Sequence, residues 1–213
     1  MLGKFIAIEG LEGAGKSTAI DIIKSKIEAA GHKVICTREP GGTPMAEAIR
    51  ACVKQPWQDE KVTVEAELLL MYAARAQLIA NVIKPNLEAG TWVIADRHDM
   101  SSQAYQGGGR QIPTDVMEPL RSITLKGFTP DLTLYMDVEP SVGLQRARGR
   151  GELDRIEIED ISFFERTRAR YLQLCQDNPK AKIIDTMQDM PLVHRDVEQS
   201  IKDYLQYVAQ VTC

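Results

Sequence analysis

The sequence lacks the residue patterns of several protein classes. Its four cysteines, Cys36, Cys52, Cys175 and Cys213, are widely spaced and include no Cys-x-x-Cys pair, and its three histidines show no metal-ligand spacing. These absences argue against zinc and redox motifs. Reduced thiols in a cytosol are the simplest interpretation of the cysteines.

The chain also lacks a basic excess and a long apolar run. Its net charge is −4, whereas proteins that bind nucleic acids or membrane surfaces usually carry a basic footprint. No stretch approaches the ~18 consecutive apolar residues of a membrane span, and Gly3, Lys4 and Glu9 interrupt the run that a signal peptide needs. We expect a cytoplasmic protein without nucleic-acid or membrane partners. A phosphate ligand held by a few local arginines remains compatible with this charge.

Short apolar segments alternate with longer helical patterns along the chain. Strands that alternate with helices predict a parallel sheet covered on both faces, so we expect an α/β fold. The length of 213 residues favours one domain. The expected strands are residues 4–9, 33–37, 91–96, 131–137 and 181–185, and the expected helices are residues 16–30, 44–54, 64–89, 114–126, 140–149, 158–176 and 191–208.

Residues 10–17, GLEGAGKS, match the phosphate-loop pattern G-x-x-x-x-G-K-[ST] without a mismatch. Its three glycines let the backbone wrap around phosphates and donate N–H groups, and the helix that follows favours anions. A strand before the pattern and a helix after it distinguish a phosphate loop from a chance glycine-rich turn. We expect Lys16 to reach the β- and γ-phosphates and Ser17 to bind Mg²⁺. The expected ATP-binding residues here are Gly10, Leu11, Glu12, Gly13, Ala14, Gly15, Lys16, Ser17 and Thr18.

A second acid supports this interpretation. The apolar stretch TWVIAD ends at Asp96, which resembles the acid that assists magnesium in phosphate-loop enzymes, here through water. A strand-capping Asp is the alternative, and the phosphate loop favours the metal role. The guanine motif Asn-Lys-x-Asp of GTPase switches is absent. A motor or transporter ATPase would usually be larger, so a small-molecule kinase is favoured.

Four arginines, Arg146, Arg148, Arg150 and Arg155, fall within ten residues of this net acidic chain. Arginine suits bidentate phosphate recognition. A mobile arginine-rich lid over approximately residues 146–158 would exclude water and neutralise charge on the transferring group, with Arg146 on the ATP side. The alternative is a solvated helix end paired with nearby acids.

The chain resembles bacterial thymidylate kinases through the stretches IEGLEGAGKST, TREPGGT, AARAQ, DRHDMSSQAYQGGGR, PDLTLYMDV and RARGRGELDRIE. They span almost the whole chain in the order of the family. The resemblance implies transfer of the γ-phosphoryl group of ATP to dTMP, giving dTDP and ADP, with Mg²⁺. It also implies the phosphate-loop nucleoside monophosphate kinase fold, a five-stranded parallel sheet flanked by helices, and a homodimer.

The resemblance assigns catalytic roles to Glu12, Lys16, Arg97 and Arg150. Glu12 matches the acidic loop residue that helps to hold the acceptor nucleotide and magnesium waters. Eukaryotic members carry a basic residue in this loop, whereas bacterial members pair the acid with a lid arginine, which here is Arg150. Arg97 matches the arginine that binds the dTMP phosphate.

The resemblance also places dTMP. Arg50 matches a second basic residue at the monophosphate, and Arg75 matches the arginine that reads the thymine edge. Tyr105 matches the tyrosine that packs against the deoxyribose and disfavours a 2′-hydroxyl in the family. Met71 stands where the family usually has a Phe stacked on the base, and methionine can make a soft sulfur–aromatic contact. The expected dTMP-binding residues are Glu39, Pro40, Arg50, Met71, Arg75, Arg97, Ser102, Tyr105 and Gln106.

Another small nucleoside or nucleotide kinase is the runner-up, and a protein that binds ATP without turnover is the alternative outside the enzymes. Segment 64–89 has more apolar positions than one buried stripe needs, so another surface must cover it. A helix of the same chain would suffice, and the resemblance favours a partner chain. Residues 107–109, three glycines, are expected to form a turn.

Overall fold

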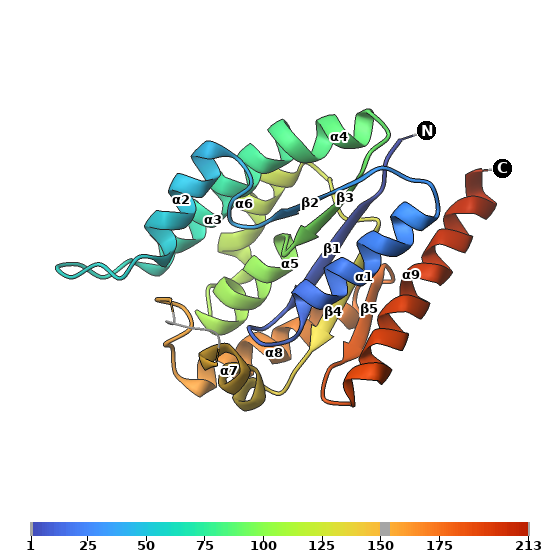
Figure 1. The fold of residues 1–213 in the computed structure, drawn as a ribbon. Coiled ribbons are helices and arrows are strands. Elements are labelled where there is room, and N and C mark those ends of the chain that lie inside the picture. Colours follow the sequence, from blue (N-terminus) through green and yellow to red (C-terminus); the bar gives the residue numbers. More distant parts are fainter. Residues whose placement is uncertain (1, 150–153, 213) are drawn as a thin grey trace.

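The computed structural model describes residues 2–149 and 154–212 and contains a five-stranded parallel sheet (Figure 1). The strand order is β2-β3-β1-β4-β5. The expected α/β fold with a five-stranded parallel sheet is therefore confirmed. The strands are β1 (Phe5–Gly10), β2 (Val34–Arg38), β3 (Trp92–Asp96), β4 (Leu132–Asp137) and β5 (Ala181–Asp185).

Helices cover both faces of the sheet. On one face, α1 (Lys16–Ala29) packs against α9 (Met190–Thr212), and Figure 1 shows both on the side nearer the viewer. Alternate side chains of a strand point to opposite faces, and the core follows this rule. Ile6 and Ile8 of β1 belong to the cluster that contains Ile23 and Ile201. Phe5 belongs to a second cluster with residues of the opposite layer.

The opposite layer begins with three consecutive helical segments. These are α3 (Val64–Leu78), the π-helix η1 (Ile79–Ile83) and α4 (Lys84–Glu88), which together occupy the expected helix 64–89. Leu78, Ile79 and Ile83 belong with Phe5 to the second cluster. The remaining helices are α2 (Pro44–Lys54), α5 (Asp99–Ser102), the π-helix η2 (Gln103–Gly109), α6 (Thr114–Leu125), α7 (Pro140–Arg148) and α8 (Ile161–Gln176).

Side-chain caps fix the starts of the helices that flank the site. Thr43 accepts a hydrogen bond from the Ala46 N–H at the start of α2. Thr63 does the same for Ala66 at the start of α3. A Ser, Thr, Asp or Asn cap contributes about 1 kcal/mol to a helix. Pro44 at the first position adds a preset backbone angle.

The expected turn at residues 107–109 is wrong, because these glycines lie in η2. Glycine is a poor helix former, but here close packing against α8 decides the structure. A Cβ on Gly109 would lie 2.5 Å from Phe163 Cε2, and one on Gly108 would lie 2.6 Å from Arg170 Cβ. The missing side chains therefore let η2 approach α8 and carry Tyr105 and Gln106 to the site.

One stretch, Val64–Glu88, is long and apolar enough by composition to cross a membrane, although a core helix of a soluble protein passes the same test. Leu68, Leu78 and Ile83 on this stretch are buried in the protein, which fits a core helix. Cys36, Cys52 and Cys175 are free in the described part of the chain.

Candidate active site

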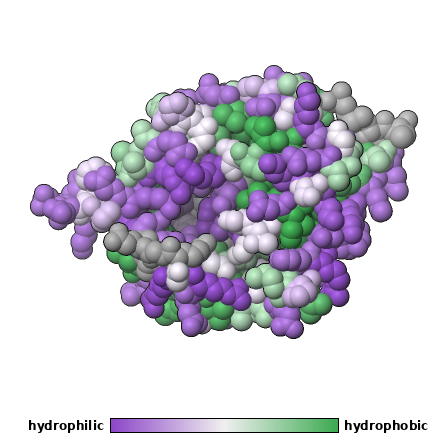
Figure 2. All heavy atoms as spheres, viewed as in Figure 1, coloured by the Kyte–Doolittle hydropathy of each residue, from purple (hydrophilic) through white to green (hydrophobic). Residues whose placement is uncertain are grey.

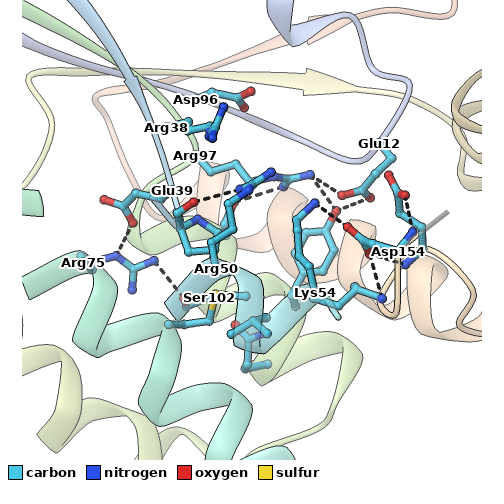
Figure 3. A pocket seen from close by; sticks show the side chains of 18 of the residues that line it. Glu12, Arg38, Glu39, Arg50, Lys54, Arg75, Asp96, Arg97, Ser102 and Asp154 are labelled. Carbon is cyan, nitrogen blue, oxygen red and sulfur yellow. Dashed lines mark hydrogen bonds and ion pairs between the residues drawn. The ribbon is translucent and has the colours of Figure 1, made fainter. Parts of the chain in front are cut away.

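A cavity lies beyond the carboxyl ends of β1, β2 and β3, where an open parallel sheet usually binds ligands (Figure 3). Hydrophilic residues gather around this hollow on the left of the space-filling view (Figure 2). Its lining includes the expected residues Glu12, Lys16, Glu39, Pro40, Arg50, Met71, Arg75, Asp96, Arg97, Ser102, Tyr105 and Gln106, and also Arg38, Val53, Lys54, Ser101, Asp154, Ile156 and Glu157.

The phosphate loop connects β1 directly to α1. Gly15 at the helix start has φ 86°, and Gly13 has φ 74°, backbone conformations that favour glycine. A Cβ on Gly13 would also lie 2.1 Å from the Gly143 carbonyl oxygen, so α7 packs tightly on the loop. The loop is thus held in a shape that leaves the first N–H groups of α1 free for an anion.

Lys16 stands at the mouth of this loop. Its ammonium group donates to the carbonyl oxygens of Gly10 and Leu11 at 3.2 and 3.1 Å. Burial, and then the nearby positive charge of Arg97, lower the pKa of Lys16 to about 8. A bound phosphate would favour the charged ammonium and would therefore raise the pKa of Lys16 again. This is the electrostatic environment expected of a phosphate-binding lysine before its ligand arrives.

Glu12, Arg97 and Tyr105 form a compact hydrogen-bonded group (Figure 3). Arg97 Nη2 donates to Glu12 Oε1 at 2.6 Å, and the Tyr105 hydroxyl donates to Glu12 Oε2 at 2.6 Å. The Arg97 guanidinium also lies 4.9 Å from the centre of the Tyr105 ring. Burial acts to raise the pKa of Glu12, but the charges of Arg97 and Lys16 outweigh it and hold this pKa below its usual value. The carboxylate is therefore ionised beside the phosphate loop.

The backbone at Arg97 explains how two successive residues line one cavity. Arg97 has φ 73°, a left-handed conformation that is rare outside glycine. Neighbouring strand residues normally point to opposite faces, and the turn directly after Asp96 breaks this alternation. Asp96 and Arg97 consequently both line the cavity. Such strain is common at functional sites.

Arg75 lies at the other end of the cavity and is almost fully buried. Its Nε donates to Glu39 Oε2 at 2.7 Å and its Nη2 donates to Ser102 Oγ at 2.9 Å (Figure 3). Its Nη1 has no hydrogen-bond partner among the described residues, although Asp99 Oδ1 lies 3.6 Å away. Glu39 is in turn bonded to His98 Nδ1 at 2.8 Å. This network holds Arg75 rigidly at the edge of the cavity.

The residues present fit a magnesium ion that is bound jointly with phosphate. Asp96 Oδ1 is buried without a hydrogen-bond partner in the described part of the chain, and Ser17 lies in the first turn of α1. Among the described residues, no group of three or more His, Cys, Asp or Glu forms a metal site. Mg²⁺ typically uses one or two protein ligands, waters and substrate phosphates, so Ser17 and Asp96 are a sufficient protein contribution.

Comparison with known proteins agrees with this geometry. The family model described as thymidylate kinase matches residues 8–197. The chain belongs to the thymidylate kinase family. It is 60% identical over 205 residues to the thymidylate kinase of Alteromonas mediterranea, which covers 96% of this chain and 92% of that one. It is 56% identical to that of Idiomarina loihiensis (96% and 100% coverage) and 55% identical to that of Vibrio parahaemolyticus (96% and 98%). The family resemblance and the class of nucleoside monophosphate kinase are thus confirmed.

Several predicted site residues lie outside the cavity lining or outside the described part of the chain. Arg146 in α7 lies near the Thr186 carbonyl oxygen, with Nη1 at 3.4 Å, and its Cβ lies close to Gly13. Arg155 instead donates to Glu67 and to the Val53 carbonyl oxygen. Arg150 lies outside the described residues. Thr18 is exposed on α1.

The sequence assigned no individual role to Arg38, Lys54 or Asp154, although Asp154 lies within the expected lid 146–158. Arg38 ends β2 and lies in the stretch TREPGGT of the family resemblance, so its place at a strand end is the signal that points to it. Lys54 and Asp154 form an ion pair across the cavity (Figure 3). No local pattern indicates that pair, because it depends on residues 154–157 folding onto the end of α2.

Proposed function

We propose that the chain transfers the γ-phosphoryl group of ATP to dTMP, giving dTDP and ADP, with Mg²⁺ bound to ATP. The observation that carries the proposal is the position of Glu12. This acid belongs to the phosphate loop, yet its carboxylate is bonded to Arg97 and Tyr105 of the neighbouring cavity. A donor site and an acceptor site that share one residue are suited to direct transfer between two bound nucleotides.

Phosphoryl transfer leaves little covalent chemistry to the protein, so positioning and charge stabilisation dominate. The loop N–H groups and Lys16 hold the ATP phosphates, and Arg97 and Arg50 hold the dTMP phosphate in line with them. Glu12 fixes Arg97 through the 2.6 Å contact. Magnesium, when bound near Ser17 and Asp96, supplies further positive charge to the phosphates.

The opposite end of the cavity selects the nucleoside. Tyr105 is 6% exposed and bonded to Glu12, which holds its ring in one position. In the proposed complex this ring packs against the deoxyribose and leaves no room for a 2′-hydroxyl. Arg75 and Gln106 provide polar groups for the base, with Ser102 and Glu39 holding Arg75. Pro40 and Met71 add apolar surface. The proposed substrate is a deoxynucleoside monophosphate with thymine as its base.

Arg150 remains the proposed catalytic lid residue, on the sequence alone. Glu12 supplies no positive charge to the outer side of the γ-phosphoryl group, so a lid arginine has to provide it. We also propose one domain over residues 1–213 with a lid over approximately residues 146–158. A cytoplasmic location without nucleic-acid or membrane partners completes the proposal.

A homodimer is proposed through α3 and α6. These helices pack against each other, yet Leu69 on α3 is 54% exposed and Ile123 on α6 is 71% exposed. Val116 lies seven residues before Ile123, on the same side of α6, and is also exposed. Large exposed apolar side chains on neighbouring helices favour a covering partner, here a second copy related by a two-fold axis.

A coupled ADP-release assay tests this function. We expect turnover with dTMP, weaker turnover with dUMP, and little with thymidine or with the ribonucleotide of thymine. A lost methyl group costs only ~1–3 kcal/mol, so dUMP should retain activity. Preference for thymidine over dTMP would favour the runner-up, a nucleoside kinase. ADP release that no nucleotide acceptor stimulates would refute the proposed function.

A further inference from the structure

Glu67 is a buried carboxylate of α3 that does not line the cavity but touches a residue that does. It is 1% exposed, and its Oε1 accepts a hydrogen bond from Gln106 Nε2 at 2.8 Å. Gln106 lines the cavity. Glu67 therefore stands behind one of the proposed contacts to the base.

Two arginines hold Glu67 in place and keep it ionised. Arg110 donates from Nε to Oε1 at 3.2 Å and from Nη2 to Oε2 at 3.1 Å, and Arg155 Nη2 donates to Oε2 at 2.6 Å. Burial acts to raise the pKa of Glu67, but the hydrogen bond and charge of Arg110 outweigh it and lower this pKa. An ionised carboxylate offers only acceptors.

This charge state determines which end of the Gln106 amide faces the ligand. A glutamine amide carries two N–H donors on Nε2 and an acceptor on Oε1, and the two ends can exchange by a flip. The ionised Glu67 can pair only with the N–H end. No hydrogen bond reaches Gln106 Oε1 within the described ranges 2–149 and 154–212, so this oxygen remains available to a ligand donor.

We propose that Glu67 is a positioning residue that selects the base by fixing the orientation of the Gln106 amide. Gln106 is 1% exposed but lines the cavity, and an acceptor that it presents there suits a pyrimidine with an N–H at position 3, as in thymine and uracil. Cytosine presents an unprotonated nitrogen there, which would face the Gln106 oxygen without a hydrogen. The inference rests on the proposed function for its substrate class, and its structural part is testable without turnover.

The activity test compares dUMP with dCMP, because both lack the 5-methyl group and they differ only at positions 3 and 4 of the base. The Glu67→Gln variant removes the charge and permits the Gln106 amide to flip. We expect the ratio of kcat/KM for dUMP over dCMP to fall on the order of tenfold in Glu67→Gln. Glu67→Asp keeps a carboxylate and should retain most of the wild-type ratio, even if both activities fall. Glu65→Gln, at an exposed position two residues earlier on α3, is the matched control and should keep the wild-type ratio.

A general loss of packing would lower both substrates together and leave the ratio unchanged, and that result would overturn the proposal. An equal fall in the ratio for Glu67→Gln and Glu67→Asp would also overturn it, because the effect would then not follow the carboxylate.

A second measurement uses the wild-type chain and does not require that Glu67→Gln folds. In the ligand-free protein, the side-chain N–H₂ protons of Gln106 should exchange with solvent at least tenfold more slowly than those of an exposed glutamine such as Gln176, as followed by ¹⁵N NMR. Exchange as fast as that of the exposed side chain would overturn the proposal. Slow exchange in a chain that phosphorylates no pyrimidine deoxynucleotide would refute the proposed function but leave the amide orientation intact.

Discussion

The low pKa of Lys16 has a direct consequence for the pH dependence of the proposed reaction. Burial and the charge of Arg97 lower this pKa from 10.5 to about 8 in the ligand-free chain. Above this pH the free chain carries increasingly neutral Lys16, which attracts phosphate less strongly. We expect kcat/KM for ATP to fall as pH rises above about 8, approaching tenfold per pH unit, because kcat/KM reports the free enzyme.

The size of the pKa shift of Lys16 gives the free energy that ATP binding can recover. A difference of 2.5 between 10.5 and 8 corresponds to roughly 3 kcal/mol at 1.36 kcal/mol for each pKa unit. The ATP phosphates should recover most of this by favouring the charged ammonium. At pH 8 about half of the free Lys16 groups are protonated, whereas nearly all should be protonated in the complex. Binding at pH 8 should therefore take up about half a proton from the buffer.

Calorimetric titration of ATP at pH 8, in buffers of different ionisation enthalpy, measures this uptake. Glu12 is one of the charges that raise the Lys16 pKa, so Glu12→Gln should shift the alkaline limb of the pH profile to lower pH. The matched perturbation of opposite sign is Arg97→Met, which removes a charge that lowers the pKa and should shift the limb to higher pH. A profile flat to pH 9.5 with no proton uptake at pH 8 would refute the assignment of this limb to Lys16.

Four further outcomes are expected. Arg150→Ala should lower kcat by a factor on the order of 10³ with little change in KM for dTMP, because a lid arginine acts on the transition state. Steady-state kinetics measures both constants, and an unchanged kcat would remove Arg150 from the mechanism. Tyr105→Ala should raise turnover of the ribonucleotide relative to dTMP, and an unchanged ratio would show that another group excludes the 2′-hydroxyl. Gly109→Val should lower the free energy of unfolding, measured by chemical denaturation, by about 1–3 kcal/mol, because a Cβ at this position would lie 2.5 Å from Phe163. Gly127→Val is the comparison: a Cβ there meets no atom within 4 Å, so this variant reports backbone strain alone. Ile123→Asp should yield a monomer in sedimentation equilibrium at micromolar concentration; a wild-type chain that is already monomeric would contradict the proposed dimer.

The regular parts of the fold were predictable because their signals are local. Strands such as Trp92–Asp96 are almost continuously apolar, and their burial on both faces follows from that composition. The phosphate loop depends on eight consecutive residues, and the structure places it between β1 and α1 as expected. Asp96 was predicted from its place at the end of a strand and Arg97 from the family resemblance, and the structure places both in the cavity lining.

The remaining features depend on contacts between segments that lie far apart in the chain. The three glycines of η2 look like a turn when taken alone, and only the surface of α8 makes them helical. Lys54 meets Asp154, and Glu67 meets Arg155, across 100 and 88 positions respectively. No periodicity or motif records such pairings.

The same contrast between local signals and contacts of distant segments applies to recognition of the base. Gln106 and Arg75, the proposed contacts to the base, were predicted because the stretches that contain them match a family pattern. Glu67 of α3 determines whether Gln106 presents its oxygen or its N–H₂ group to the base, and Glu67 itself does not line the cavity. Its effect depends on charge: the same Gln106 beside a neutral partner could present either end of its amide. Selectivity at the base therefore includes the two partly buried arginines, Arg110 and Arg155, that keep Glu67 ionised. A chain that kept Gln106 but lost this carboxylate would retain the proposed contact residue without the fixed preference.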